Sequence, residues 1–344
     1  MNGHEVSAFT TTLSATLKES YRYGESALSP TALQEKRSFR LLGWPLHNTL
    51  APLIHNKLFS LRGIPWHYSV LESKDPQDLI VELDDEQAVG SAVTMPHKLV
   101  FTQHVDVLNE EATAVGALNT IFFRRNKDGR KIRVGGNTDV LGVRESFVNN
   151  ASKADIEKAA TRPGLIVGCG GAARSSVYAL WRFFGVKKFY LANRLKSEAD
   201  DVASQFTKLS GFDATFEYLS TGEEAKAAET PFFVVGTVPD HPPSSAEEHA
   251  VQDIMKELLT SEQRERGVVL EMCYHPKVQT TLYNLCEAAG WTVIPGTEAT
   301  LWQDVVQHLL WTEKEGIQDV WVKETRTAIW DAIEESRRKK AAEL

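Results

Sequence analysis

The feature that most restricts the fold of this chain is a glycine-rich segment, Leu165–Arg174, which opens with a short apolar run. Its spacing is G-x-G-x-x-A, with Gly168 and Gly170 in the first two places and Ala173 in the third. Such glycines permit a tight turn and bring a phosphate to the amides of a helix N-terminus, and a small third residue lets that helix pack on its sheet. Because a helical pattern follows over Ala172–Phe184, the segment predicts a strand-loop-helix unit that binds a dinucleotide.

The end of the next expected strand, 188–192, indicates which dinucleotide is bound. A site for NAD usually has an acidic residue roughly 20 residues after the glycines, whereas a 2′-phosphate is met by arginine. This chain has Asn193, Arg194 and Lys196 at that place, and its first acidic residue is Glu198. The local chemistry therefore favours NADP over NAD, with a solvated arginine at a strand end as the alternative.

Strand and helix patterns alternate on both sides of this loop, which is typical of mainly parallel sheets covered by helices. A chain of 344 residues with 42% apolar residues is long enough for two cores. The expected strands are Phe39–Leu42, Trp66–Leu71, Ser91–Val93, Leu165–Val167, Lys188–Ala192, Ala214–Tyr218, Phe232–Val235 and Val268–Met272, and the expected helices include Pro52–Arg62, Pro76–Glu82, Thr300–Glu313 and Asp319–Lys340.

We therefore predict an α/β protein with two domains. A substrate domain with a mainly parallel sheet is expected over residues 37–138 and again, through the two last helices, over 297–344. A Rossmann-like domain that binds NAD(P) is expected over 139–296. Residues 1–36 are rich in Ser, Thr and Glu and carry a Ser-Pro break, so they are predicted to be a flexible N-terminal extension.

Charge and composition exclude several classes of protein. The formal net charge of −8 argues against nucleic-acid binding, which needs a concentrated basic face. The sequence shows no signal peptide pattern and no apolar stretch that could span a bilayer. Three cysteines without CxxC suit a reducing, cytoplasmic setting, and the ten histidines lack metal-ligand spacing. We expect neither a metal, a membrane nor a nucleic acid as partner, and the oligomeric state stays open.

Three polar clusters precede the glycine loop: Val93–Lys98, Gly116–Thr120 and Gly136–Asp139. Each follows or interrupts an apolar stretch, so each is expected at a strand end, where an α/β sheet gathers its ligands. Together they supply hydroxyls, carboxamides, a lysine and a carboxylate, which suits a small polyhydroxylated molecule. Oxidation of an alcohol by a nicotinamide needs a proton acceptor beside the hydroxyl, and Lys98 with Asp139 is the natural pair.

The chain resembles the shikimate and quinate dehydrogenase family, and among its members the fungal quinate/shikimate type, from about Phe39 to Glu313. The resemblance is carried by motifs in the family's order and at compatible spacings. They are Val93–Lys98, Gly116–Thr120, Asn137–Asp139, Gly168–Arg174, Val238–Asp240, Leu270–Tyr274 and Gly296–Gln303.

The resemblance implies a role for each matching residue. It implies a dehydrogenase that interconverts quinate or shikimate with the corresponding keto acid, a cyclic polyol carboxylate being the substrate. Lys98 would be the catalytic lysine and Asp139 its carboxylate partner. Substrate contacts would come from Thr49, Thr94, Asn119, Tyr274 and Gln303, and cofactor contacts from Gly168, Gly170, Gly171, Ala172, Asn193 and Arg194.

One segment departs from the family pattern. Members usually carry Ser-x-Ser-Pro after the first strand, and both hydroxyls bind the substrate carboxylate. Here Thr49 retains one hydroxyl and Ala51 lacks the other, while His47 or Asn48 could replace it. The extra room beside Ala51 suits quinate, which has one more hydroxyl at that carbon. Two alternatives stay open: a binding or regulatory protein without turnover, and a dehydrogenase for a related hydroxy acid.

Overall fold

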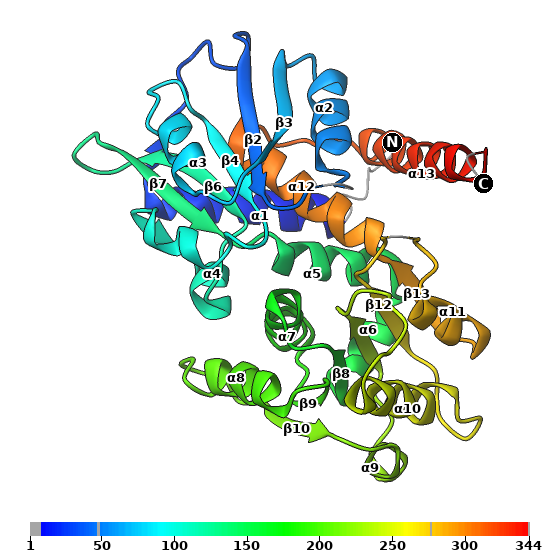
Figure 1. The fold of residues 1–344 in the computed structure, drawn as a ribbon. Helices are drawn as coiled ribbons and strands as arrows, with labels where there is room; N and C mark the ends of the chain where they lie inside the picture. Colours follow the sequence, from blue (N-terminus) through cyan, green and yellow to red (C-terminus); the bar gives the residue numbers. More distant parts are fainter. Residues whose placement is uncertain (1–7, 47–48, 276, 343–344) are drawn as a thin grey trace, which may run out of the picture. The chain divides into compact units, whose positions relative to one another are not determined.

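The structure is a computed structural model that describes residues 8–46, 49–275 and 277–342, and it divides into two units (Figure 1). The first unit takes the described residues up to Thr113, then Ala117–Thr138 and those from Gln303 onwards. The second takes Ala114–Gly116 and Asp139–Trp302. The sequence placed the return to the first domain at residue 297. In the structure the division falls inside helix α12 (Gly296–Thr312), because that helix runs unbroken through this point.

The first unit is built on a mixed sheet (Figure 1). Its strands lie in the order β3 (Trp66–Glu72), β2 (Arg37–Gly43), β4 (Gly90–Val93), β6 (Thr120–Arg125), β7 (Lys131–Gly136) and β5 (Val107–Leu108). The predicted strands β2, β3 and β4 are parallel, and β6 and β7 form an antiparallel hairpin that the sequence analysis did not anticipate. The α/β class is confirmed, and the hairpin makes this sheet less parallel than expected.

Helices supply the rest of the first unit's core. The predicted helices α2 (Ala51–Leu61), α3 (Gln77–Leu83) and α13 (Asp319–Ala342) are present, with shorter elements η2 (Val100–Gln103) and α4 (Glu110–Val115). Along α12, Val305, Val306 and Leu309 are buried, and the Trp311 indole donates to the backbone oxygen of Ile121, 2.9 Å away. This helix therefore anchors the polar side chains that it carries.

The described part of the N-terminal segment is packed on the first unit, which differs from the flexible extension expected over residues 1–36. Leu13 and Leu17 of α1 (Ala8–Ser20) are buried. The buried guanidinium of Arg124 donates to the hydroxyl of Ser20 at 2.6 Å and to Glu313 at 2.8 Å. Arg124 thus fixes the end of α1 next to η1 (Tyr21–Tyr23) and β1 (Glu25–Ser26), which pairs with β6. Residues 1–7 lie outside the described part.

The second unit is a fully parallel sheet of six strands in the order β10, β9, β8, β11, β12, β13. Strands β8 and β11 lie side by side where the order reverses, which is the ligand-binding point of doubly wound sheets. The Rossmann-like prediction is confirmed. The strands are β8 (Gly164–Val167), β9 (Lys188–Ala192), β10 (Thr215–Leu219), β11 (Phe233–Gly236), β12 (Val268–Glu271) and β13 (Thr292–Pro295), and the helices are α5 (Asp139–Asn150), α6 (Lys153–Ala159), α7 (Gly171–Phe184), α8 (Lys196–Thr207), α9 (Gly222–Ala227), α10 (Ala246–Thr260) and α11 (Thr281–Ala288).

None of the helices in the described part of the chain is both long and apolar enough to cross a bilayer.

Candidate active site

The polar clusters of the first unit meet at one edge of its sheet. β2 and β4 are parallel and end at this edge, where β6 begins and β7 ends. Backbone hydrogen bonds join the loops there: Val93 donates to the oxygen of Asn119 (2.9 Å), and Leu118 donates to the oxygen of Lys98 (3.0 Å). The structure therefore brings the segments of Lys98 and Asn119 together.

Thr94 lies between two neighbouring loops. Its backbone nitrogen donates to the oxygen of Leu42 at 2.8 Å, and Trp44 donates to the oxygen of Met95 at 3.0 Å. At Gly43 a Cβ atom would lie 2.4 Å from Cγ2 of Thr94, so only glycine allows this close approach. Thr94 is half-buried, with its side chain at the same edge as the other clusters.

The carboxamide of Asn119 is held in one orientation. Its Oδ1 accepts from the backbone nitrogen of Thr138 (2.8 Å), from the hydroxyl of Thr120 (2.7 Å) and, at a longer 3.2 Å, from the hydroxyl of Thr138, so both lone pairs are used. Its Nδ2 donates to Oε1 of Gln303 at 3.2 Å. This bond directs the oxygen of the half-buried Gln303 carboxamide at Asn119. The contact therefore orients both carboxamides, with Nδ2 of the buried Asn119 towards Gln303 and the amide nitrogen of Gln303 away from Asn119.

The segment around Thr49 and Ala51, which departs from the family pattern, contributes a single hydroxyl to the polar edge among its described residues. Thr49 Oγ1 accepts from the backbone nitrogen of Ala51 at a long 3.3 Å, a bond that does not use the hydroxyl proton. Ala51 is buried as the first residue of α2. His47 and Asn48, named as replacements for the missing hydroxyl, lie outside the described residues.

The glycine loop of the second unit has the geometry that a pyrophosphate needs. Gly168 has φ +97°, and a Cβ there would lie 2.6 Å from Oγ1 of Thr237. Gly170 is the N-cap of α7, and at Gly170 and Gly171 a Cβ would meet no atom within 4 Å. Ala173, in the first turn of α7, is fully buried. The amides at the start of α7 are thus open to an anion, and these residues fit a dinucleotide.

The residues after β9 are held by acidic partners. Asn193 Nδ2 donates to Glu198 at 2.7 Å, Arg194 donates to Glu248 at 2.9 Å, and the Lys196 ammonium lies 2.6 Å from Asp200. Backbone and hydroxyl hydrogen bonds from Ser244, followed by the bond from Arg194, lower the pKa of Glu248 to about 2. Glu248 is therefore ionised, and an anion that bound Arg194 would have to compete with it.

Tyr274 follows β12 through a turn that a buried carboxyl group holds. Glu271 ends β12 and is 2% exposed, and its Oε1 accepts from the backbone nitrogen of Cys273 at 2.9 Å. Burial raises the pKa of Glu271 to about 7. A Cβ at Gly236 would lie 2.4 Å from Oε2 of Glu271, so the neighbouring strand needs glycine. Tyr274 itself is half-buried.

The predicted proton-handling pair falls on different units. Lys98 lies in the loop after β4 and is half-buried, and Asp139 begins α5 and is buried. Lys98 belongs to the first unit and Asp139 to the second. Their pairing, and the meeting of Tyr274 with the substrate residues, therefore stay predictions.

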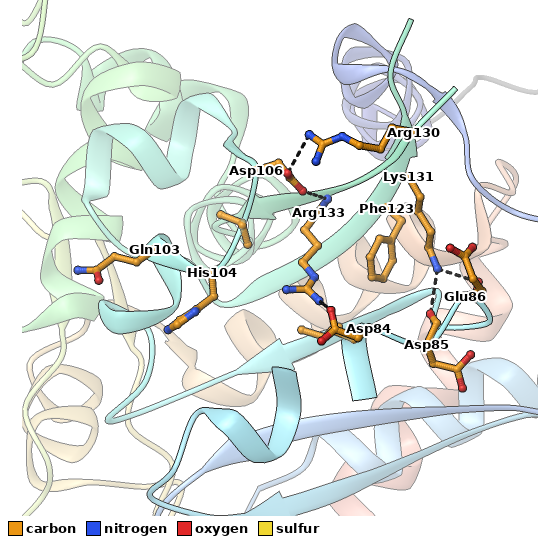
Figure 2. A pocket seen from close by; sticks show the side chains of 12 residues that line it. Asp84, Asp85, Glu86, Gln103, His104, Asp106, Phe123, Arg130, Lys131 and Arg133 are labelled. Carbon is orange, nitrogen blue, oxygen red and sulfur yellow. Dashed lines mark hydrogen bonds and ion pairs between the residues drawn. The ribbon is translucent and has the colours of Figure 1, made fainter. Parts of the chain in front are cut away.

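A separate cavity of about 520 Å³ lies at the end of β7 that is opposite to these clusters (Figure 2). Figure 2 shows charged side chains around it, and Arg130 and Arg133 form ion pairs there. Arg130 bonds Asp106 at 3.1 Å, Arg133 bonds Asp84, and the Lys131 ammonium donates to two backbone oxygens while lying 4.2 Å from the Phe123 ring centre. Asp85 and Glu86 also line the cavity, so its carboxylates outnumber the lysine and arginine side chains, and we assign no ligand to it.

Sequence reasoning missed several residues that hold the site. Thr120 and Thr138 stand inside the quoted clusters but received no role, and their bonds to Asn119 give them one. His55 and Gln307 had no sequence signal, because their contacts join residues far apart in the chain. Glu248 was missed because α10 is remote in sequence from Arg194.

Comparisons with known proteins show what this chain is similar to. The family model described as the shikimate dehydrogenase substrate binding domain matches residues 41–121. A quinate dehydrogenase of Emericella nidulans is 33% identical over 292 residues, which cover 81% of this chain and 88% of that protein.

The chain is also similar to solved structures of shikimate and quinate dehydrogenases. The structure of dehydroquinate dehydratase and shikimate dehydrogenase from S. pombe AroM is 28% identical, with a TM-score of 0.68 over 85% of this chain and 53% of that one. The structure of quinate dehydrogenase from Corynebacterium glutamicum in complex with NAD is 22% identical, with a TM-score of 0.68 over 86% of this chain and 100% of that one. The second likeness concerns the fold alone.

Proposed function

This chain belongs to the shikimate and quinate dehydrogenase family and is an oxidoreductase of CH–OH donors. We propose that it interconverts quinate with the corresponding keto acid, and that it does the same less effectively with shikimate and its own keto acid. The observation that carries this proposal is the pair Asn119 and Gln303, whose N–H groups suit the oxygen atoms of a polyol ring. Thr94 and Thr49 add hydroxyls from neighbouring loops.

The proposed chemistry divides between the two units. A nicotinamide bound over the glycine loop would accept or return the hydride. Lys98 would take the proton of the reacting hydroxyl, and Asp139 would hold the ammonium group in place. Tyr274 would lie beside the substrate. These roles are carried over from the family, residue by residue.

The preference for quinate rests on Ala51. A serine at that position would add a hydroxyl, and its absence costs a hydrogen bond to the substrate carboxylate of about 1.5–3 kcal/mol, roughly 10- to 150-fold in affinity. Quinate has a hydroxyl on the same carbon and can fill the space. An Ala51→Ser variant should therefore shift the ratio of kcat/KM towards shikimate.

We propose NADP as the preferred cofactor, because Arg194 stands at the end of β9 where a 2′-phosphate would lie. Its exposed side chain can leave Glu248, since exposed ion pairs are weak. NAD stays the second candidate, supported by the carboxylates of Glu198 and Glu248 near this strand end.

One experiment tests substrate and cofactor together. Nicotinamide absorbance is followed with quinate and shikimate, each crossed with NADP and NAD. We expect the highest kcat/KM with quinate and NADP. A shikimate preference of several hundredfold would overturn the quinate proposal, and no turnover with any combination would favour a binding protein or a related hydroxy acid as substrate.

A further inference from the structure

A chain of buried hydrogen bonds leads through the first unit to Asn119. The Nε2 of His55, on α2, lies 3.1 Å from Oε1 of Gln307, on α12. The Nε2 of Gln307 donates to the hydroxyl of Thr120 at 2.9 Å, and this hydroxyl donates to Oδ1 of Asn119 at 2.7 Å. None of the four side chains is more than 3% exposed. These hydrogen bonds thus join three segments that are distant in sequence, below the polar edge of the sheet.

The donor-to-acceptor direction of this series of hydrogen bonds is fixed at both ends. The backbone nitrogen of Thr138 can only donate, so the group of Asn119 that faces it must be the oxygen. At the other end, Oδ1 of Asp304 lies 3.5 Å from Nε2 of His55, which favours a proton on that nitrogen. Between these ends, each donor is opposed by an acceptor. Reversing Gln307 would turn Thr120 away from Asn119.

We propose that Gln307 and His55 are positioning residues, which act through Thr120 to hold Asn119 and Gln303 with their N–H groups towards the substrate. This inference rests on the proposed function, since Asn119 and Gln303 are substrate residues only in that function. The inference also predicts which substrates this pair selects. The ring substituent that meets this pair must accept hydrogen bonds, so a hydroxyl or keto oxygen fits and an ammonium group is excluded.

Substitutions at Thr120 and Gln307 separate polarity from packing. Thr120→Val keeps the shape and removes the hydroxyl, whereas Thr120→Ser keeps the hydroxyl and removes a buried methyl group. Gln307→Glu keeps the shape of Gln307 but replaces its donor with an acceptor, so the Thr120 proton turns from Asn119 to the new carboxylate. If Thr120 acted only through the packing of its methyl group, Thr120→Ser would be at least as harmful as Thr120→Val.

Steady-state kinetics of the full chain give the first readout. We expect Thr120→Val and Gln307→Glu to raise the KM for quinate by roughly 5- to 20-fold, the loss of about one hydrogen bond. Thr120→Ser should change it by less than about twofold, and kcat and the Kd for NADPH should change little in all three. Equal KM values in all variants, or a loss with Thr120→Ser as large as with Thr120→Val, would overturn the inference.

Crystal structures of the same variants give a second readout that needs no turnover. We expect the contact between Nδ2 of Asn119 and Oε1 of Gln303 to be lost in Thr120→Val and Gln307→Glu and retained in Thr120→Ser. A wild type inert towards both acids would refute the proposed function, and the crystal structures would still decide the positioning role. The same contact in all three variants would refute that role.

Discussion

Replacing Arg194 tests how this protein selects its cofactor. In the proposed complex the guanidinium of Arg194 binds the 2′-phosphate, and hydrogen bonds to a charged group contribute about 1.5–3 kcal/mol, roughly 10- to 150-fold in affinity. Arg194 must first leave Glu248, which lies 2.9 Å away. The arginine side chain is 56% exposed, so that pair is weak, and we expect Arg194→Gln to lose about tenfold in affinity, near the lower end of the range.

Equilibrium binding isolates this effect from catalysis. Adenosine 2′,5′-bisphosphate and adenosine 5′-monophosphate are titrated calorimetrically against wild type and Arg194→Gln. The bisphosphate should bind about tenfold more weakly to the variant, and the monophosphate within about twofold of wild type. An unchanged ratio between the two ligands would refute the assignment of Arg194 to the 2′-phosphate.

Glu248 provides the complementary variant. Because its carboxylate is ionised at any working pH, Glu248→Gln should release Arg194 and strengthen bisphosphate binding by about two- to fivefold. The gain should disappear in the Arg194→Gln background. Glu247→Gln is a matched control, since it removes an exposed charge from the same helix turn with no bond to Arg194. An equal gain with Glu247→Gln would indicate a general charge effect instead of competition.

Three further predictions concern catalysis and stability. Lys98→Ala should lower kcat on quinate by at least about 100-fold while calorimetry still detects quinate binding, and a variant with wild-type kcat would remove Lys98 from catalysis. The raised pKa of Glu271 means that the native state keeps a proton that the unfolded chain loses between about pH 4.5 and 7, so this group makes stability fall as pH rises through that window. Glu271→Gln should remove this loss in the free energy of unfolding, which is roughly 3 kcal/mol. Denaturant unfolding of wild type and variant at pH 5 and pH 8 measures it, and an equal pH dependence in the two proteins would contradict the reasoning. Arg124→Met leaves Glu313 buried without its cation and should cost about 3–5 kcal/mol in the same unfolding measurement, whereas Arg125→Met, at an exposed neighbouring position, should cost much less.

Much of the secondary structure could be predicted because its signals are local. The expected strand Lys188–Ala192 coincides with β9, and the helix expected at Ala172–Phe184 begins one residue earlier, at Gly171. The hairpin β6–β7, with Asn126 and Gly129 in its turn, was not predicted, because its pairing with β4 and β1 joins segments that are distant in sequence. The anchoring of α1 was missed since it depends on a buried arginine more than a hundred positions away.

The sequence by itself determined the α/β class, the dinucleotide loop and the polar clusters, because glycine spacing and apolar periodicity act within a few residues. Only the tertiary structure decided how these groups are oriented. The carboxamides of Asn119 and Gln303 became donors through Thr138, Thr120 and Gln307, and Arg194 acquired a competing carboxylate from α10. Hydrogen-bond direction and ion pairing are properties of groups in contact, and the chain brings those groups together only when both sheets have formed.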